Sequence, residues 1–296
     1  MFKRKNKADV ANLMEKLDKM TAKGGGKFES DPNEWHPTKD QAGNGSAVIR
    51  FLPAKDENGE DVPFVKILSH SVKNNGQWYI ENCPTTLGER CPVCDSNSEL
   101  WNSGIQSNKE IASERKRKTS YWANIVVIQD KANPEAEGKV FKWRFGQKIM
   151  DKIIAMGKPE FDGETPVDVT DVYEGAHFYV KVEKVKGFAN YDKSKFGSAS
   201  ELFDGDTAKL KEVWKGMHAL KPIVAADQFK PYDELDKKFK RVLGLTGKAA
   251  PAPAQEFVQD LDQVDTSDDI PFDMPDASVD VGGVDDLDDF FDELNS

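Results

Sequence analysis

The chain has 296 residues, of which 38% are hydrophobic and 31% are charged, and its formal net charge at pH 7 is −11. No apolar run approaches the roughly 20 residues that cross a bilayer, so the sequence excludes a membrane-spanning protein and predicts a soluble one with no membrane partner. The beginning of the chain lacks the apolar stretch of a secretion signal, so we expect a protein that is not secreted and works in a reducing cytoplasm.

The charge divides the chain into three segments. Residues 1–28 hold eight basic and three acidic residues, residues 29–248 are nearly neutral, and residues 249–296 hold fifteen acidic residues and no basic one. Solvated surface charge would explain the acidic end alone, but it explains poorly an acidic end set against a basic one. The asymmetry favours nucleic-acid binding combined with an acidic tail.

The basic segment, residues 1–28, is predicted to be an arm rather than a domain. Four apolar residues recur in it at helical spacing, and three glycines follow as a hinge: Val10, Leu13, Met14, Leu17 and residues 24–26. So short a segment cannot bury this stripe by itself. We expect it to dock on the core or on a neighbouring molecule, with Lys3, Arg4 and Lys5 mediating self-association.

Residues 29–248 are predicted to form the folded core. Five segments alternate or run apolar and are rich in β-branched and aromatic residues, as strands are: 47–52, 64–72, 120–128, 139–145 and 177–185. Helical spacing appears at residues 149–156, 210–220 and 235–243. This pattern predicts a mainly β fold with helices (α+β). The specific expectation is a five-stranded OB-fold barrel, which binds oligonucleotides across one face.

All the cysteines lie within one short stretch, preceded by a histidine in the pattern His70-x12-Cys83-x7-Cys91-x2-Cys94. Zinc prefers four tetrahedral nitrogen or thiolate donors, and a Cys-x2-Cys turn presents two thiolates to one ion. The pattern predicts one structural zinc ion in a subdomain of about residues 64–115. The alternatives are a disulfide with one free thiol, or three isolated buried thiols.

The identity of the fourth ligand is less certain from sequence, because His36, His177 and His218 also exist. Position favours His70, since a predicted strand at 64–72 and a hairpin turn at 74–76 bring the chain back towards Cys83.

Basic and aromatic residues are interleaved in the core. Binding of single strands requires a positive groove for phosphates and aromatic faces for bases. The run at residues 115–118 leads into two aromatic residues, and other rings stand next to cations in the sequence. Each ring taken alone is more often a core residue, but together they predict contacts at Arg50, Lys116, Arg117, Tyr121, Trp122, Trp143, Phe188 and Tyr191.

The last segment, residues 249–296, begins with an alanine-proline linker and is rich in aspartate. Low hydrophobicity and high charge predict disorder. Short apolar islands at Ile270, Phe272, Phe290 and Phe291 resemble docking motifs for protein partners. We also expect the carboxylates to compete with phosphates for the cationic groove.

The order of these features closely resembles the single-stranded-DNA-binding, helix-destabilising proteins of T-even-like bacteriophages. The resemblance covers nearly the whole chain, and its most specific parts are residues 1–5, 42–53, the zinc cluster, 116–124 and 187–192. It implies cooperative, sequence-nonspecific coating of single-stranded DNA in phage replication, recombination and repair, in the cytoplasm of the infected bacterium. It also implies self-association through the arm and binding of replication and recombination proteins by the tail.

Carried over by matching motif, the zinc ligands of this family fall on His70, Cys83, Cys91 and Cys94. Its DNA contacts fall on the eight core residues given above, from Arg50 to Tyr191.

Two other classes of protein compete with this interpretation. An enzyme is disfavoured because the sequence has neither a phosphate-binding Gly-x4-Gly-Lys-Ser/Thr loop nor a His-Glu-x2-His helix. A zinc ion with four protein ligands also has no open position for a reacting water. The remaining alternative is a zinc-bearing transcription-accessory or interaction protein whose nucleic-acid binding is incidental, although no clear recognition helix is present.

Overall fold

The computed structural model describes residues 31–55, 62–161 and 163–245, all of which belong to one compact unit. The predicted arm with Lys3, Arg4 and Lys5 and the predicted tail with Ile270, Phe272, Phe290 and Phe291 lie outside the described residues. Among the described helices, none combines the length and the apolar character needed to cross a membrane.

The described part of the chain is mainly strands with helices, as the sequence predicted. The strands are β1 (Glu34–Trp35), β2 (Gly45–Phe51), β3 (Phe64–Asn74), β4 (Gln77–Asn82), β5 (Lys118–Gln129), β6 (Val140–Phe145), β7 (Ala176–Val185), β8 (Phe188–Asn190) and β9 (Lys195–Ala199). The α-helices are α2 (Pro92–Asn102), α3 (Gln106–Glu114), α4 (Gln147–Gly157), α5 (Thr207–Gly216) and α6 (Tyr232–Val242). Short 3-10 helices lie between them, of which η1 (Pro84–Leu87) matters for the site.

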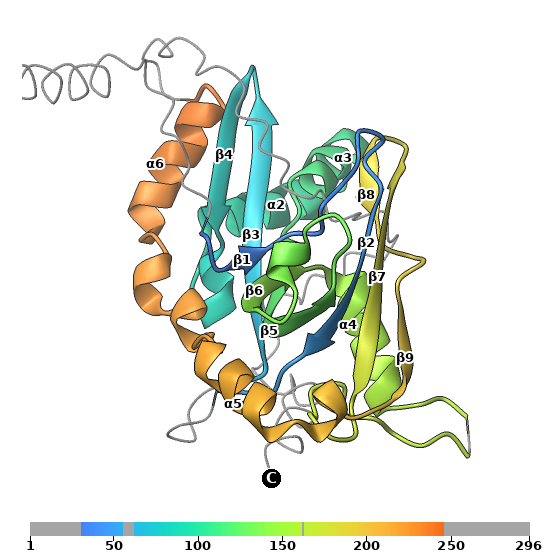
Figure 1. The fold of residues 1–296 in the computed structure, drawn as a ribbon. Coiled ribbons are helices and arrows are strands. Elements are labelled where there is room, and N and C mark those ends of the chain that lie inside the picture. Colours follow the sequence, from blue (N-terminus) through green and yellow to red (C-terminus); the bar gives the residue numbers. More distant parts are fainter. Residues whose placement is uncertain (1–30, 56–61, 162, 246–296) are drawn as a thin grey trace, which may run out of the picture. The chain divides into compact units, whose positions relative to one another are not determined.

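The strands form one sheet in which nine strands are described, more than the five that the sequence predicted. The main order is β1-β6-β5-β2-β7-β8, with β3 also beside β5, β4 beside β3, and β9 beside β7. β1, β8 and β9 are short, with two, three and five residues, so they carry too few alternations to be recognised from a pattern. β5 pairs with β2, β3 and β6 and therefore lies inside the sheet, and Figure 1 shows how the elements are arranged.

On one of its edges, β5 pairs with two different strands in succession. Its first half pairs with β3 and its second half with β2, while β6 runs beside its other edge. The pairing with β2 includes a register shift at residues 48–49. A strand that leaves one partner for another must bend, and such irregularities increase local twist.

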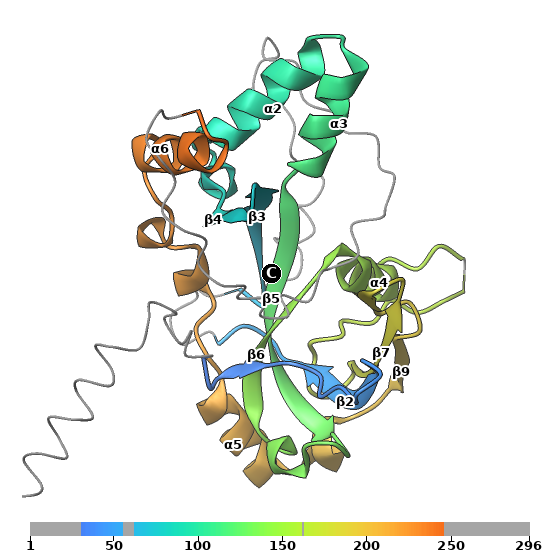
Figure 2. The ribbon, with the colours of Figure 1, turned by 90° about the horizontal axis from the view of Figure 1, so that it is seen from above.

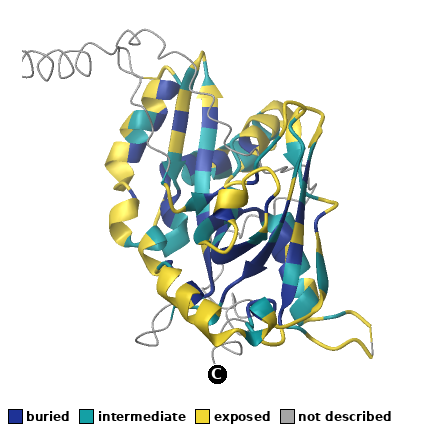
Figure 3. Ribbon diagram, in the orientation of Figure 1, coloured by how far each residue is buried: buried dark blue, intermediate teal, exposed yellow. Residues whose placement is uncertain are grey.

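Aromatic side chains from β2, β3, β6, β7 and β9 pack against one another. The ring centroid of Phe51 lies 5.6 to 6.1 Å from the centroids of Phe64, Trp143, Phe145, Phe178 and Phe196. We call these six residues the aromatic core. Rings at such separations add specific edge and offset contacts to the burial of their apolar surface. Figure 3 shows that buried residues gather along β2 and its neighbours, whereas the outward sides of α5 and α6 are exposed.

A second buried cluster lies where β3 and β4 extend away from the sheet. It joins Val72, Tyr79, Cys83, Cys91 and Val93 to Leu235, Phe239 and Val242 of α6. α6 therefore lies against β4 and α2, although the 129 residues 103–231 separate α6 from α2 in sequence, and Figures 1 and 2 agree on this. We call β4, η1, α2, α3 and the adjoining half of β3 the metal subdomain.

The sequence of α6 explains why it forms and where it ends. Asp233 and Glu234 lie in its first turn and Lys240 and Arg241 in its last, so the charges complement the helix dipole. Gly244 follows with a φ of 74°, a left-handed conformation that suits glycine and stops the helix. Its apolar side packs on the metal subdomain, and ion pairs join Lys230 and Lys238 to Glu81 of β4.

Candidate metal centre and nucleic-acid interface

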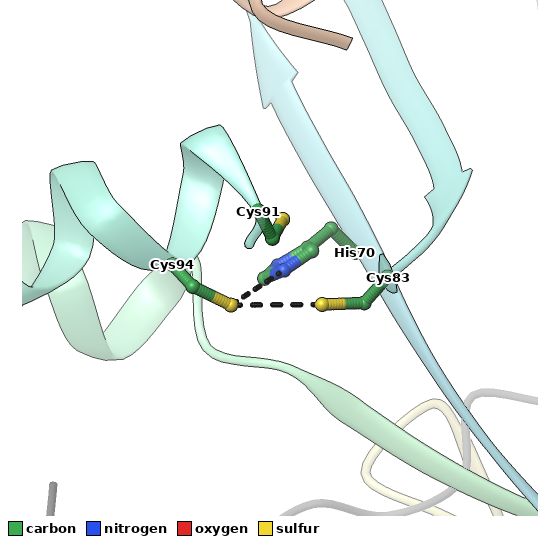
Figure 4. Close-up of side chains that lie close together, drawn as sticks. All are labelled: His70, Cys83, Cys91 and Cys94. Atoms are coloured by element: carbon green, nitrogen blue, oxygen red, sulfur yellow. Dashed lines mark hydrogen bonds between the residues drawn. The ribbon is translucent and has the colours of Figure 1, made fainter. Parts of the chain in front are cut away.

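The structure brings together the four predicted metal ligands. The donor atoms of His70, Cys83, Cys91 and Cys94 all lie within 4.8 Å of one another. Cys94 Sγ is 3.6 Å from Cys83 Sγ and 3.4 Å from His70 Nε2, and Figure 4 shows the four side chains converging. None of the three cysteines forms a disulfide. His70 is thus the histidine that completes the group, as its position in the sequence suggested.

Local structure explains this convergence. The β3–β4 hairpin turns at Asn75 and Gly76, which both have positive φ, and returns the chain to Cys83. Cys91 occupies the N-cap of α2 in an extended conformation, and Pro92 opens the helix. Cys94 follows in the first turn of the same helix, where the positive end of the helix dipole favours a thiolate.

Three of the ligand side chains have shifted pKa values. Burial alone would lower the pKa of His70, but hydrogen bonds and charge interactions with the sulfurs of Cys83 and Cys91 outweigh it and raise the pKa to about 9. Hydrogen bonds with Cys91 and Cys94 hold the pKa of Cys83 far below its usual range, whereas hydrogen bonds with Cys83 and Cys91 raise the pKa of Cys94. Thiolates this close repel one another, and a bound cation relieves that repulsion.

Residues outside the ligand set orient the ligands. His70 Nδ1 lies 3.2 Å from the carbonyl oxygen of Arg115, an arrangement in which Nδ1 donates and Nε2 is left to face the metal position. Asn97 is buried and donates to the same carbonyl at 2.9 Å. Thr85 Oγ1 lies 3.0 Å from Cys83 Sγ. Sequence reasoning missed Asn97 and Thr85, and only a hydroxyl two residues after a cysteine could have pointed to Thr85.

The basic run is attached directly to this metal centre. Residues 115–118 connect α3 to β5, and the carbonyl of Arg115 is the group that His70 and Asn97 contact. Arg117 is exposed and donates from Nη1 to Thr85 Oγ1 at 3.1 Å. Lys116 between them is partly exposed. The metal subdomain therefore holds the run that the sequence predicted to contact phosphates.

A ring and two cations share one face of the sheet where the run enters β5. Trp122 is partly exposed, and the guanidinium carbon of Arg144 on β6 lies 5.9 Å from its ring centroid. Lys118 is on the same face of β5 as Trp122, and its pKa is lowered by burial and by the charge of Arg144. Cations over an aromatic ring, close to a basic run, are typical of a surface that binds single-stranded nucleic acid.

Two other predicted contacts are accessible at a different edge of the sheet. Phe188 of β8 is 46% exposed, and Tyr191, just after β8, is partly exposed. β8 pairs only with β7 among the described strands, so the structure does not join these residues to the β5 face through neighbouring strands.

Three of the predicted contacts are interior residues, which corrects the expectation that they form an exposed face. Trp143 is 1% exposed and belongs to the aromatic core. Tyr121 is 5% exposed and donates its hydroxyl to Gln147 Oε1 at 2.8 Å. Arg50 is fully buried, and its Nη2 donates to the carbonyl oxygens of Asp171 and Ser200 at 2.9 and 2.6 Å.

The alternation of side chains along a strand explains why Trp143 is interior although cations flank it in the sequence. Lys142, Trp143 and Arg144 are consecutive in β6, and successive side chains of a strand point to opposite faces. Cations that flank a ring in the sequence are therefore on the face opposite to it. The interleaving that suggested a stacking platform at Trp143 instead marks a strand with one buried face.

Comparison with known proteins assigns this fold to a family. A family model described as "gp32 DNA binding protein like" matches residues 43–243, which is more than half of the chain. The chain belongs to this family. It is 47% identical over 279 residues to the single-stranded DNA-binding protein of Enterobacteria phage T2 and 48% identical over 280 residues to that of Enterobacteria phage T4, which in both cases covers 90% of this chain and 89% of the relative. The resemblance to the T-even-like phage proteins is confirmed, and the matched range contains the metal ligands and the strands from β2 to β9.

Proposed function

We propose that the protein binds single-stranded DNA cooperatively and without sequence preference, and coats it during phage replication, recombination and repair. The observation that carries this proposal is the partly exposed ring of Trp122 with Arg144 over it, adjacent to a basic run that contacts residues of the candidate metal centre. The names of the phage T2 and T4 relatives support it. The protein would act in the cytoplasm of the infected bacterium, as a binding protein rather than an enzyme.

The residues divide into those that contact DNA and those that support the contacts. Lys116 and Arg117 contact phosphates, and Trp122, Phe188 and Tyr191 stack on bases. Arg50, Tyr121 and Trp143 act indirectly, because their interior partners hold the strands that carry the exposed residues.

In this proposal the strands of the core form an OB-fold barrel. Support comes from β5, which pairs with β3 in its first half, pairs with β2 in its second half and carries Trp122, and from the aromatic core packed between β2, β3, β6, β7 and β9. In this class of fold, oligonucleotides cross the open face of such curved strands.

The ion at the metal centre would be a single structural zinc. Three sulfur donors and one imidazole nitrogen suit zinc better than magnesium or calcium, which prefer oxygen. When bound, zinc would supply folding free energy and hold the four segments together. Four protein ligands leave no site for a reacting water, which agrees with a protein that is not an enzyme. Metal analysis of protein purified without chelators tests the identity, with one zinc per chain as the expected result.

The ends of the chain would connect the bound protein to others. The arm, with Lys3, Arg4 and Lys5, would associate with the next protein molecule on DNA, and the acidic tail would bind replication and recombination proteins through its apolar islands. Deletion of residues 1–20 should leave affinity for a very short oligonucleotide nearly intact and abolish clustering on long strands. Equal losses on both lengths would place the arm in the DNA groove.

Quenching of tryptophan fluorescence by single strands, duplex and RNA at several salt concentrations tests the main proposal. Single-stranded DNA should bind more tightly than duplex, and saturation should occur at a fixed number of nucleotides per protein. In Arg117→Ala, one lost phosphate contact should reduce the salt slope of log K by about 0.7. Equal binding of duplex without a fixed site size would favour the alternative, a zinc-bearing transcription-accessory protein.

A further inference from the structure

Thr85 connects the metal centre to the basic run through two short contacts. Its Oγ1 lies 3.0 Å from the sulfur of Cys83, and the same oxygen accepts a hydrogen bond from Nη1 of Arg117 at 3.1 Å. Thr85 belongs to η1, the 3-10 turn that begins directly after Cys83. One hydroxyl thus separates a metal ligand from an exposed arginine.

The chemistry of Arg117, Thr85 and Cys83 fixes which group donates and which accepts in the two hydrogen bonds between them. A guanidinium can only donate, so the oxygen of Thr85 is the acceptor from Arg117. The hydroxyl proton is then available to the sulfur of Cys83 at 3.0 Å, which accepts it because a cysteine that ligates a metal is a thiolate. Donation from Arg117 polarises the hydroxyl and strengthens its own donation, because hydrogen bonds in a chain reinforce one another.

A second contact attaches the other end of the basic run to the metal centre. The carbonyl oxygen of Arg115 accepts from His70 Nδ1 and from Asn97 Nδ2. With its backbone held at residue 115, the run has limited freedom to carry Arg117 away from Thr85. The hydrogen bond to Thr85 is therefore positioned to respond when Arg117 meets an anion.

We propose that Thr85 is a positioning residue that transmits phosphate binding at Arg117 to the metal-bound thiolate of Cys83. The inference rests on the proposed function, in which Arg117 contacts a phosphate. A phosphate bound to Arg117 competes with Thr85 for the guanidinium, so the hydroxyl of Thr85 is polarised less. Its hydrogen bond to the sulfur of Cys83 then weakens, and the sulfur keeps more electron density. Coupling between two sites is reciprocal, so the state of the metal centre also affects the availability of Arg117 to DNA.

The full chain with Co²⁺ at the metal centre gives a direct readout. Thiolate-to-cobalt charge transfer absorbs in the near ultraviolet, and its energy falls as the sulfur becomes richer in electrons. Addition of a short oligothymidylate should shift this band to longer wavelength in the unaltered protein. Thr85→Val keeps the shape of the side chain without the hydroxyl and should abolish the shift, whereas Thr85→Ser should retain it.

Two further variants sharpen the test. Arg117→Ala removes the donor at an exposed position, so its band should start near the DNA-bound position and move no further. Thr86→Val is a matched control, because the Thr86 hydroxyl accepts from the backbone N–H of Leu68. Its band should shift as in the unaltered protein. An equal shift in Thr85→Val, or loss of the shift in Thr86→Val, would overturn the proposal.

Tryptophan fluorescence in the same samples separates this inference from the proposed function. Quenching by the oligothymidylate without any movement of the cobalt band would refute the role of Thr85 and leave DNA binding intact. Absence of quenching in the unaltered protein would refute DNA binding and the coupling with it. Absence of a charge-transfer band would refute the thiolate centre on which the coupling depends.

Discussion

The metal subdomain and the aromatic core share strand β3 but differ in how they are built. The metal subdomain consists of a hairpin, a 3-10 turn and two short helices, and its buried cluster is completed by α6 from the far end of the core. The aromatic core lies between long paired strands and contains six packed rings. The proposed zinc site and one distant helix would hold the first region together, whereas burial of apolar surface holds the second.

This difference affects the two regions' roles. A segment held by ligands keeps polar and charged groups at its surface, so the basic run can begin at residue 115 beside the metal centre. A segment held by burial gives one face of each strand to the interior, and only alternate residues such as Trp122 and Arg144 remain available. Loss of either kind of support should therefore unfold different parts of the molecule.

Loss of the metal should have the largest effect. Structural zinc sites contribute on the order of 10–16 kcal/mol of binding free energy in zinc-finger peptides. Chelation or Cys91→Ala should remove amide-exchange protection from β4, α2 and α6, because these elements share the cluster that contains Cys83 and Cys91, and from α3, because it packs against α2. β2 and β7 should keep their protection. Uniform loss throughout the chain, or no loss, would show that the two regions are not separately stabilised.

The converse experiment removes a ring from the aromatic core. Trp143→Ala should reduce the free energy of unfolding by about 3–5 kcal/mol, because the side chain is 1% exposed and contacts several other rings. Denaturant titration measures the change, and Trp143→Phe should cost less. The cobalt charge-transfer band of the folded variant should be unchanged. A stable variant that had lost only DNA affinity would restore Trp143 as a stacking residue.

An exposed ring should behave in the opposite way. Phe188 is 46% exposed, so Phe188→Ala should change the free energy of unfolding by no more than about 0.5 kcal/mol. Affinity for single strands should fall by about 1–3 kcal/mol at every salt concentration, since stacking does not release counterions. Fluorescence titration at two salt concentrations measures this. A changed salt slope would assign the loss to phosphate contacts instead.

The smallest effect concerns an ion pair at the edge of the sheet. Lys142 Nζ lies 2.7 Å from Asp31 Oδ2, and this hydrogen bond, with one from the N–H of Asn33, holds the pKa of Asp31 below its ordinary value of 3.8. A lowered pKa stabilises the fold above about pH 4, and the contribution is lost as the pH falls through the lowered value.

The side chain of Asp31 is 38% exposed, so solvent screens the pair and its contribution should be below about 1 kcal/mol. In Asp31→Asn, the decrease in the free energy of unfolding on acidification should be smaller by that amount. Denaturant titrations between about pH 3 and pH 7, the range that spans the shift, measure it. A difference that persisted unchanged at the acid end would point to a packing defect rather than to the charge.

Some features of the fold and site could be predicted because they depend on neighbours in the sequence. The alternation at residues 47–52 and 177–185 is a property of the strand itself, and it predicted β2 and β7. β9 could not be predicted, because its residues 195–199 show no alternation and it exists through pairing with β7. The same holds for Thr85, whose partner Arg117 is 32 residues away.

The sequence by itself determined the three cysteines of the ligand set and favoured His70 as the fourth member, since zinc chemistry limits both the residue types and their spacing. It also determined the division of charge along the chain. Only the tertiary structure decided that Trp143 and Arg50 are interior while Trp122 is accessible, and that α6 closes the metal subdomain. Burial results from contacts between distant segments, so the choice of which face of a strand meets solvent is made only when the sheet folds over its core.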